Sequence, residues 1–215
     1  ENIDEETTLQ VEVARLLQDE ANRLFIQKAA GPGRLYYTAH LETFLPVEEV
    51  QALNSGIIVG RAYTLASCDP ERLAEGETCP RVDQAQIGET VRVRLTIIAP
   101  NDLYYVVVED PIPAGAEAVD VQLETTSVVG QAPELRLADP WSWDGWGWGW
   151  FSHTELRDEK AVLFASYLPA GTYEYTYLIR PGLAGEFQVL PTAAYEMYFP
   201  EVSGRGDGMA FTIGE

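Results

Sequence analysis

The stretch YLPAGTYEYTYLIRPGLAGEFQVLPTAAYEMYFPEVSGRG, residues 167–206, decides the fold class of this chain. From Tyr173 to Ile179 every second residue is tyrosine or isoleucine, which is the period of a β-strand with one apolar face. Proline and glycine recur over residues 181–191 and exclude a long helix there. We interpret residues 155–180 as a β-hairpin, and we predict that a second layer covers its aromatic face.

The same alternation extends through the chain from Ile57 onward. Residues 91–97 alternate Val, Leu and Ile with Arg and Thr, so one face of this strand should point inward. Residues 103–108 form a near-continuous apolar run, which predicts a central strand buried on both sides. Residues 116–127 are expected to form a further strand or an irregular extension, and residues 128–152 a loop. About seven or eight short strands result, which predicts an all-β chain with an immunoglobulin-like antiparallel sandwich.

The first part of the chain is expected to form a separate unit. Residues 9–17 favour a strand, although the same residues also suit one face of a helix, and residues 23–29 and 34–45 have strand patterns. These strands are too few to close a core of their own. We therefore place a boundary between residues 1–46 and a sandwich of residues 47–215.

Composition narrows the class of partner. The 215 residues carry 34 acidic and 14 basic side chains, for a net charge of -20, which opposes binding to nucleic acid and to an anionic membrane. No apolar run approaches the roughly 18 residues that a membrane-spanning helix requires, so direct membrane insertion is not expected. The sequence begins at Glu1 without a methionine or a signal-like segment, so we interpret it as a fragment of a longer polypeptide.

Two cysteines, Cys68 and Cys79, flank a polar segment, SCDPERLAEGETCP. A disulfide between them would stabilise the fold by roughly 3 kcal/mol through loss of unfolded-chain entropy, and it would imply an oxidising compartment. Two free thiols in a cytosolic protein are the alternative. A zinc site requires four ligands, and His40 and His153 are the only imidazoles available, so neither a metal nor a cofactor is predicted.

Five tryptophans alternate largely with glycine in a short segment: Trp141, Trp143, Trp146, Trp148 and Trp150. Exposed rings on a loop could present a platform for a carbohydrate or a protein partner. Alternatively, they pack on their own domain or on a neighbouring one. The tripeptide Arg205 to Asp207 reads RGD, which some adhesion receptors recognise, but matches of three residues are frequent by chance.

Catalysis finds little support in the sequence. The chain contains no G-x-S-x-G elbow and no H-E-x-x-H pair, and neither cysteine has neighbours that would lower the pKa of its thiol. A hydrolase using carboxylates brought together by the fold is the remaining enzymatic alternative. We therefore expect a chain that is not an enzyme.

Four segments, taken together, resemble the C-terminal portion of bacterial α2-macroglobulins, which are thioester-containing protease inhibitors. They are GPGRLYYTAHL at 31–41, SGIIVGRAY at 55–63, LYYVVVEDPIPAGAEAV at 103–119, and residues 155–206. The cysteine loop and the tryptophan segment depart from the family pattern. The resemblance implies that residues 1–46 are the returning strands of a CUB-like domain and that residues 47–215 are the terminal macroglobulin-type sandwich. It also implies an exported parent protein, in the periplasm or at the cell surface and compatible with a lipid anchor.

The resemblance further implies a role for Met197 and Tyr198. In the family a Cys-x-x-Gln pair forms the thioester, but here Glu71 and Val82 stand where glutamine is needed, so the thioester should lie in an upstream domain. The terminal domain shields that bond until a protease cleaves a bait segment, and a Met-Tyr pair belongs to the shield. Its partners would be the upstream thioester and macroglobulin domains and, through the parent, the target proteases. Alternatively, Met197 and Tyr198 are core residues of a last strand.

Overall fold

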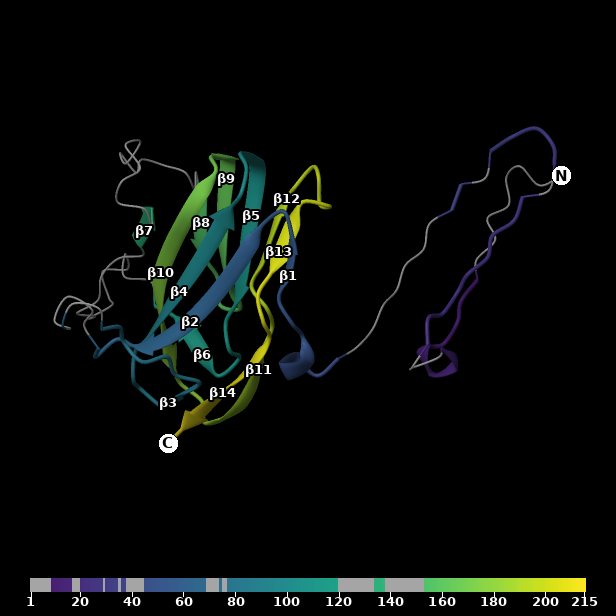
Figure 1. Cartoon of the computed structure of the whole chain (residues 1–215). Coiled ribbons are helices and arrows are strands. Elements are labelled where there is room, and N and C mark those ends of the chain that lie inside the picture. Colours follow the sequence, from purple (N-terminus) through teal and green to yellow (C-terminus); the bar gives the residue numbers. More distant parts are fainter. Residues whose placement is uncertain are drawn as a thin grey trace. The chain divides into compact units, whose positions relative to one another are not determined.

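The computed structural model (Figure 1) describes residues 9–16, 20–28, 30–34, 36–37, 45–68, 74, 77–119, 134–137 and 153–215. The chain divides into two compact units, Glu1–Leu45 and Pro46–Glu215. None of the described helices is long and apolar enough to cross a bilayer.

The described residues of Glu1–Leu45 form one 3-10 helix, η1 (Val13–Arg15), and no strand. The strand predicted at residues 9–17 is therefore wrong, and residues 20–28 are not a strand either. A strand is stable only when a neighbouring strand completes its hydrogen bonds, and none of the described residues of this unit is in a strand. Most of the strand predicted at 34–45, with His40, lies outside the described residues. The CUB-like identity of this unit stays a prediction.

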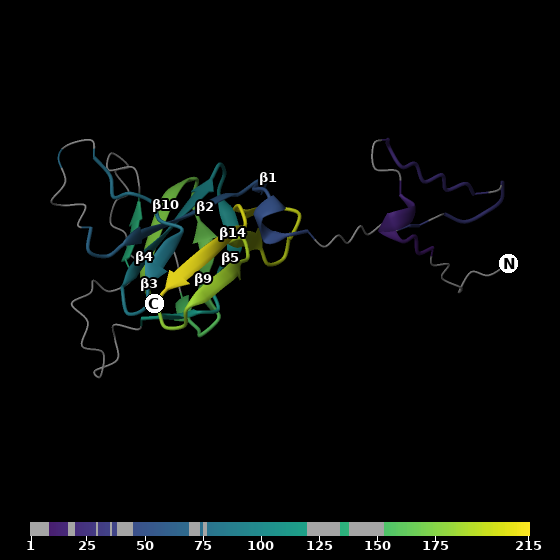
Figure 2. The ribbon, with the colours of Figure 1, turned by 90° about the horizontal axis from the view of Figure 1, so that it is seen from below.

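The larger unit is an antiparallel β-sandwich, as the sequence predicted, in which two sheets lie face to face (Figure 1, Figure 2). In order across the first, six-stranded sheet lie β1 (Leu53–Ser55), β13 (Ser203–Arg205), β12 (Ala193–Glu196), β5 (Leu103–Pro111), β9 (Lys160–Leu168) and β8 (His153–Leu156). The second, five-stranded sheet contains β2 (Ile58–Leu65), β4 (Val91–Ala99), β10 (Gly171–Pro181), β6 (Ala116–Ala118) and β7 (Glu134–Leu137).

A smaller three-stranded sheet closes one end of the sandwich. It has the order β11 (Gly185–Val189), β14 (Met209–Gly214) and β3 (Gln84–Gln86), and β14 pairs with β3 in parallel. A 3-10 helix, η2 (Val47–Glu49), lies against β14. Phe211 of β14 is fully buried and meets Tyr63 of β2 edge to face, with ring centroids 5.1 Å apart. The small sheet therefore shares the core of the sandwich.

The alternation read from β4 and β10 is confirmed. In β4 the odd-numbered residues from Val91 to Ala99 are buried, and in β10 the three tyrosines and Ile179 are buried beside them. The two strands pair antiparallel, with Tyr175 opposite Leu95. Each fully buried aliphatic side chain stabilises the fold by about 1.5–3 kcal/mol, so this alternation is the main source of the core's stability.

The predicted hairpin between β9 and β10 is wrong. β9 pairs with β5 and β8 in one sheet, whereas β10 pairs with β4, β6 and β7 in the other. The short link at Pro169 and Ala170 therefore carries the chain across the sandwich. Both strands are strongly apolar on one face, and a hairpin would leave both faces on the same side of one sheet. Placing the strands in opposite sheets lets the two faces cover each other.

Two further expectations are corrected. The run 103–108 does form a central strand, β5, but Tyr104 and Tyr105 are exposed rather than buried, while the three valines that follow are buried. The region 128–152, expected to be a loop, contains β7, which pairs with β10. Short segments of charged and apolar residues such as ELRL give too weak a pattern to predict without their partner strand.

A buried polar network joins the two large sheets. Arg61 of β2 donates from Nη1 to Asp110 Oδ1 of β5 over 2.8 Å, and Tyr177 Oη donates to Asp110 Oδ2 over 2.6 Å. Thr192 Oγ1 completes the set with a 2.6 Å bond to Asp110 Oδ1. The Asp110 side chain is 0% exposed. Burial, reinforced by the Asp110 charge, holds the pKa of Tyr177 well above its usual range, so Tyr177 remains a donor.

Candidate functional site

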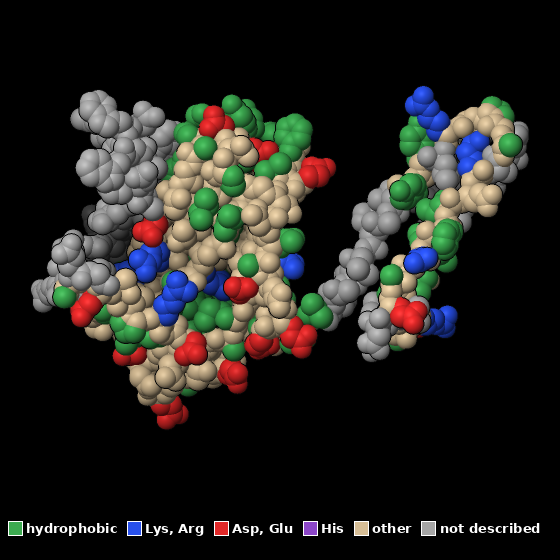
Figure 3. Space-filling model, in the orientation of Figure 1, with side chains coloured by type: hydrophobic (Ala, Val, Ile, Leu, Met, Phe, Trp, Pro, Cys, Tyr) green, Lys and Arg blue, Asp and Glu red, His purple; other side chains and the backbone are tan. Residues whose placement is uncertain are grey.

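An exposed group of aromatic and apolar side chains lies at one end of the six-stranded sheet. Its members, which we call the aromatic patch, are Tyr104, Tyr105, Tyr167, Met197, Tyr198 and Phe199. Figure 3 shows hydrophobic side chains gathered at the end of the domain where β5 begins and β9 and β12 end in Figure 1. Soluble domains rarely leave a contiguous apolar surface bare, so such a patch indicates a contact surface.

The β12–β13 loop, residues 197–202, places three members of the patch at its tip. Two backbone hydrogen bonds fold the loop back on itself, from Phe199 N to Glu196 O at 3.2 Å and from Val202 N to Phe199 O at 2.9 Å. Met197 is 50% exposed and Tyr198 is 65% exposed. The alternative that these two residues belong to the core is therefore wrong.

Tyr105 lies beside this loop in a backbone conformation that tyrosine rarely adopts. Its φ angle is 52°, in the left-handed region, although it stands inside strand β5. Its carbonyl accepts a 2.9 Å hydrogen bond from Met197 N–H. Its ring meets the ring of Tyr198 edge to face, with centroids 5.0 Å apart and planes at 87°. Tyr105 thus contacts both Met197 and Tyr198.

The rest of the patch is tied to β9 and to the turn that precedes β5. The rings of Tyr104 and Tyr167 lie 5.2 Å apart, and Tyr167 Oη donates to Asp102 Oδ2 over 2.9 Å. Ala170 N–H donates to the other carboxylate oxygen of Asp102, also over 2.9 Å. The Ala170 N–H, and to a lesser degree the Tyr167 hydroxyl, lower the pKa of Asp102. Asp102 therefore stays ionised and fixes the orientation of Tyr167.

A buried carboxylate lies directly beneath the patch. Glu196, the last residue of β12, is only 7% exposed, and its Oε1 accepts a 2.6 Å hydrogen bond from Tyr104 N–H. Its backbone N–H bonds to Val202 O at 3.0 Å and so closes the base of the β12–β13 loop. Glu196 therefore links the loop to the start of β5.

Sequence reasoning found Met197 and Tyr198 but missed Tyr104, Tyr105 and Tyr167. One signal was available: two adjacent tyrosines inside an otherwise aliphatic strand cannot both face the core, because successive residues point to opposite faces. The five tryptophans from Trp141 to Trp150 lie outside the described residues, so the prediction that they form a binding platform stays a prediction.

The predicted disulfide is present: Cys68 and Cys79 are bonded, and their Cα atoms are 5.9 Å apart. The chain has no other cysteine, so it has no thiol with which to form a thioester of its own. Among the described residues, no group of three or more His, Cys, Asp or Glu side chains could hold a metal ion.

The side chains of the RGD tripeptide are used within the fold. Arg205 Nε donates to Gln51 O over 3.2 Å, and Asp207 Oδ1 accepts a 2.8 Å bond from Ala52 N–H. Both therefore hold the segment before β1 in place. The fold therefore gives Arg205 and Asp207 a structural role that requires no adhesion receptor.

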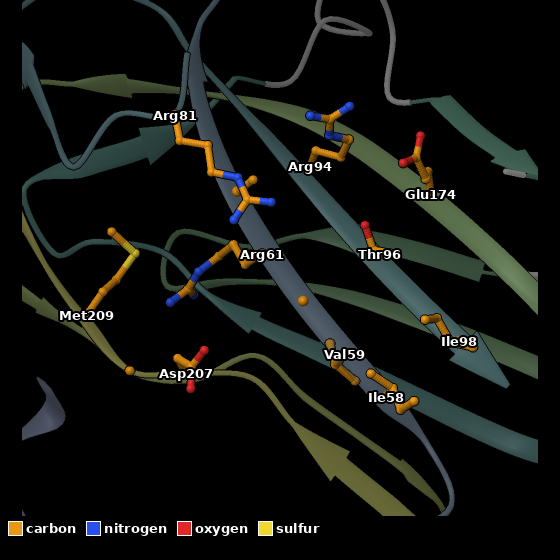
Figure 4. Close-up of a pocket in the computed structure, with 13 residues that line it drawn as sticks. Ile58, Val59, Arg61, Arg81, Arg94, Thr96, Ile98, Glu174, Asp207 and Met209 are labelled. Atoms are coloured by element: carbon orange, nitrogen blue, oxygen red, sulfur yellow. The ribbon is translucent and has the colours of Figure 1, made fainter. Parts of the chain in front are cut away.

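A groove of about 550 Å³ runs along the outer side of β2 and β4 (Figure 4). Arg81 and Asp207 lie on one side of it and Arg94 and Glu174 on the other, and Gly60 is among the residues that line it. Basic and acidic side chains both line the groove, so it does not select an ion of one sign. The aromatic patch is the stronger candidate for a functional surface.

The comparisons with known proteins agree with this sandwich. The family described as "Bacterial Alpha-2-macroglobulin MG10 domain" matches residues 56–201, which is more than half of the chain. An "Alpha-2-macroglobulin homolog" of Nostoc is 29% identical over 129 residues, covering 60% of this chain and 6% of that protein. The chain belongs to the bacterial α2-macroglobulin family, and the matched part of its sandwich is an MG10 domain.

Solved structures agree with the fold. Salmonella α2-macroglobulin reacted with methylamine is similar with a TM-score of 0.55 and 19% identity, over 77% of this chain and 10% of that one. Escherichia coli α2-macroglobulin activated by porcine elastase gives a TM-score of 0.58 at 19% identity, over 77% of this chain and 14% of that one. The chain therefore spans a small fraction of the length of the relatives that it matches.

Proposed function

We propose that this chain is a non-catalytic part of a bacterial α2-macroglobulin-type protease inhibitor, in which Met197 and Tyr198 shield a thioester in another domain of the same polypeptide. The observation that carries the proposal is the exposure of these two side chains at the tip of the β12–β13 loop. Family membership supports it, because the matched domain belongs to bacterial α2-macroglobulin. Relatives described as reacted with methylamine and as activated by elastase support an amine-sensitive, protease-triggered parent.

The chemistry of the pair suits a shield. A thioester is an electrophile that water and small amines destroy, so its resting state requires a contact surface that excludes both. A thioether and an aromatic ring exclude water, and the tyrosine hydroxyl can donate a hydrogen bond at the rim of the contact. The chain's own cysteines form a disulfide, so the reactive sulfur must come from elsewhere in the parent.

Release of the shield would be the switch of the inhibitor. In the resting parent the aromatic patch is buried against the thioester domain, and cleavage of a bait segment by a protease separates the two surfaces. The exposed thioester then reacts with a lysine of that protease. The partners of this chain are accordingly the thioester and macroglobulin domains of the parent and, through the parent, its target proteases. The disulfide supports export to the periplasm or the cell surface.

Oxidation of the two methionines tests the proposal directly, because the chain contains only Met197 and Met209. Met197 is exposed in this domain, whereas Met209 packs against the core. In the full-length parent, hydrogen peroxide should oxidise Met197 slowly in the resting state and several times faster after protease treatment. Met209, read in the same mass spectra, should oxidise at one rate in both states. Equal rates for Met197 before and after cleavage would remove the proposal.

A further inference from the structure

We propose that Tyr105 is the positioning residue of the shield. In this inference, which rests on the proposed function, the left-handed backbone and the ring of Tyr105 hold Met197 and Tyr198 in the arrangement that covers the thioester. Tyr105 itself need not touch the reactive bond.

The backbone distortion at Tyr105 is confined to one residue. On its N-terminal side Tyr104 is paired with Tyr167, and on its C-terminal side Val106 is paired with Ala165, so the ladder between β5 and β9 continues in register. A tyrosine with φ of 52° inside a regular ladder is strained, and such strain persists only where surrounding contacts impose it. Strained residues of this kind gather at functional sites.

The distortion changes where two side chains point. In an unbroken strand Tyr104 and Tyr105 would face opposite sides of the sheet. Here both are about half exposed and belong to the same patch, while Leu103 and Val106 on either side are buried. The ring of Tyr105 therefore reaches the surface next to the β12–β13 loop instead of entering the core.

Tyr105 then contacts each member of the shield in a different way. Its carbonyl oxygen accepts the Met197 N–H over 2.9 Å, which fixes the backbone at the start of the loop. Its ring packs edge to face against Tyr198 at 5.0 Å, which fixes the side chain at the tip. Tyr105 thus holds the backbone of Met197 through its carbonyl oxygen and the side chain of Tyr198 through its ring.

Glu196 and Tyr104 prevent the strained residue from relaxing. The Tyr104 N–H donates to the buried Glu196 carboxylate over 2.6 Å, immediately before Tyr105 in the chain. The Val106 to Glu196 pairing between β5 and β12 follows immediately after it. Tyr105 is therefore clamped on both sides to the strand that ends at the shield.

Three substitutions at Tyr105, made in the full-length parent, separate the two contacts. Tyr105→Phe keeps the ring and the carbonyl. Tyr105→Gly accepts a positive φ and keeps the carbonyl contact but loses the ring. Tyr105→Val loses the ring and disfavours the left-handed backbone. Leu183→Ala is the control, since it removes an exposed apolar side chain that lies outside the aromatic patch, between β10 and β11.

Two readouts are compared for each variant. The first is amide hydrogen exchange of Met197 in the protease-cleaved parent, where the patch is uncovered. The second is the rate of methylamine uptake by the resting parent. Tyr105→Gly should leave Met197 exchange within about twofold of wild type but raise uptake about tenfold, the scale of a lost aromatic pair. Tyr105→Val should raise both about tenfold, and Tyr105→Phe and Leu183→Ala should change neither by more than about twofold.

The outcomes separate the inference from the proposed function. If Tyr198→Ala raises methylamine uptake but Tyr105→Gly and Tyr105→Val do not, the shield is real and Tyr105 does not position it. If Tyr105→Val exposes the Met197 amide but neither it nor Tyr198→Ala changes uptake, Tyr105 positions the loop and the shield proposal is wrong. Unchanged Met197 exchange in Tyr105→Val overturns the inference regardless of uptake.

Discussion

Arg61 Nη1 lies 2.8 Å from Asp110 Oδ1, and this ion pair joins the two sheets of the sandwich through its interior. The side chains are 4% and 0% exposed, respectively. Asp110 also accepts hydrogen bonds from the hydroxyl groups of Tyr177 in the opposite sheet and of Thr192, the residue before β12. Because Asp110 lies near the end of β5, the network fixes the position of the strand that carries Tyr104 and Tyr105.

Removing the carboxylate of Asp110 should destabilise the domain strongly. Asp110→Ala leaves the Arg61 guanidinium buried without a counter-charge, which costs about 3–5 kcal/mol in the free energy of unfolding. The free energy is measured by urea denaturation. Glu109→Gln is the matched control, because Glu109 pairs with Lys160 near the surface at 2.7 Å and its loss should cost less than about 1 kcal/mol. If Asp110→Ala and Glu109→Gln lowered the free energy of unfolding by similar amounts, the structural role of the network would be contradicted.

The close approach of β13 to the segment before β2 gives a second prediction. A Cβ atom added at Gly204 would lie 2.0 Å from the backbone oxygen of Ile57. Because the atom that the Cβ would meet is backbone and not the end of a flexible side chain, Gly204→Ala should destabilise the domain by about 1–3 kcal/mol or more. Gly60→Ala is the control, since a Cβ there meets no atom within 4 Å. Thermal unfolding of the two variants should therefore differ clearly, and equal melting temperatures would contradict the register between β13 and Ile57.

Reduction of the disulfide should lower stability without changing the core. Cys68 and Cys79 are separated by 11 residues, and closing a loop of that length reduces unfolded-chain entropy by an amount equivalent to about 3 kcal/mol. We expect the urea midpoint to fall on addition of a reductant. The double variant Cys68→Ser with Cys79→Ser should unfold at the lowered midpoint whether or not reductant is present. A midpoint insensitive to reductant in the unmodified chain would show that the bond does not constrain unfolding.

Asp102 gives a prediction for acidic pH. Its pKa is lowered in the folded state from the usual 3.8, first by the Ala170 N–H and then by the Tyr167 hydroxyl. A group with a lowered folded pKa contributes stability above its unfolded pKa and loses that contribution as pH falls through the folded pKa. The contribution should therefore be complete above about pH 4 and should decline as the pH falls below that value. In an NMR titration Tyr167→Phe should raise the pKa of Asp102 part of the way to 3.8, and an unchanged value would contradict the hydrogen bond.

The faces of the strands that point into the sandwich were predictable where apolar and polar residues alternate strictly. β4 and β10 bury every second residue, and their inward faces follow from the sequence alone. The sheet to which a strand belongs was not predictable, because the pattern of β9 and β10 fits a hairpin as well as a crossing between sheets. Pairing depends on contacts far apart in the chain, such as Tyr175 with Leu95, which a local pattern does not encode.

The candidate site was predicted only in part. Met197 and Tyr198 came from the family resemblance, and their exposure could not be read from a sequence that also suits a buried strand. Tyr105 was missed because its contacts are with Met197 and Tyr198, which lie more than 90 positions away in the chain. The sequence of β5 alone gives no reason for a left-handed residue there.

The rate of methylamine uptake by the resting full-length parent tests the central claim most directly. If Met197 and Tyr198 shield a thioester, Met197→Ala and Tyr198→Ala should each raise that rate about tenfold, as expected from losing about 1.4 kcal/mol of contact. Leu183→Ala, which removes an exposed apolar side chain between β10 and β11, should leave the rate unchanged. Methylamine uptake at the wild-type rate by both Met197→Ala and Tyr198→Ala would contradict the account. A full-length parent that takes up no methylamine even when it is unfolded would contradict it as well.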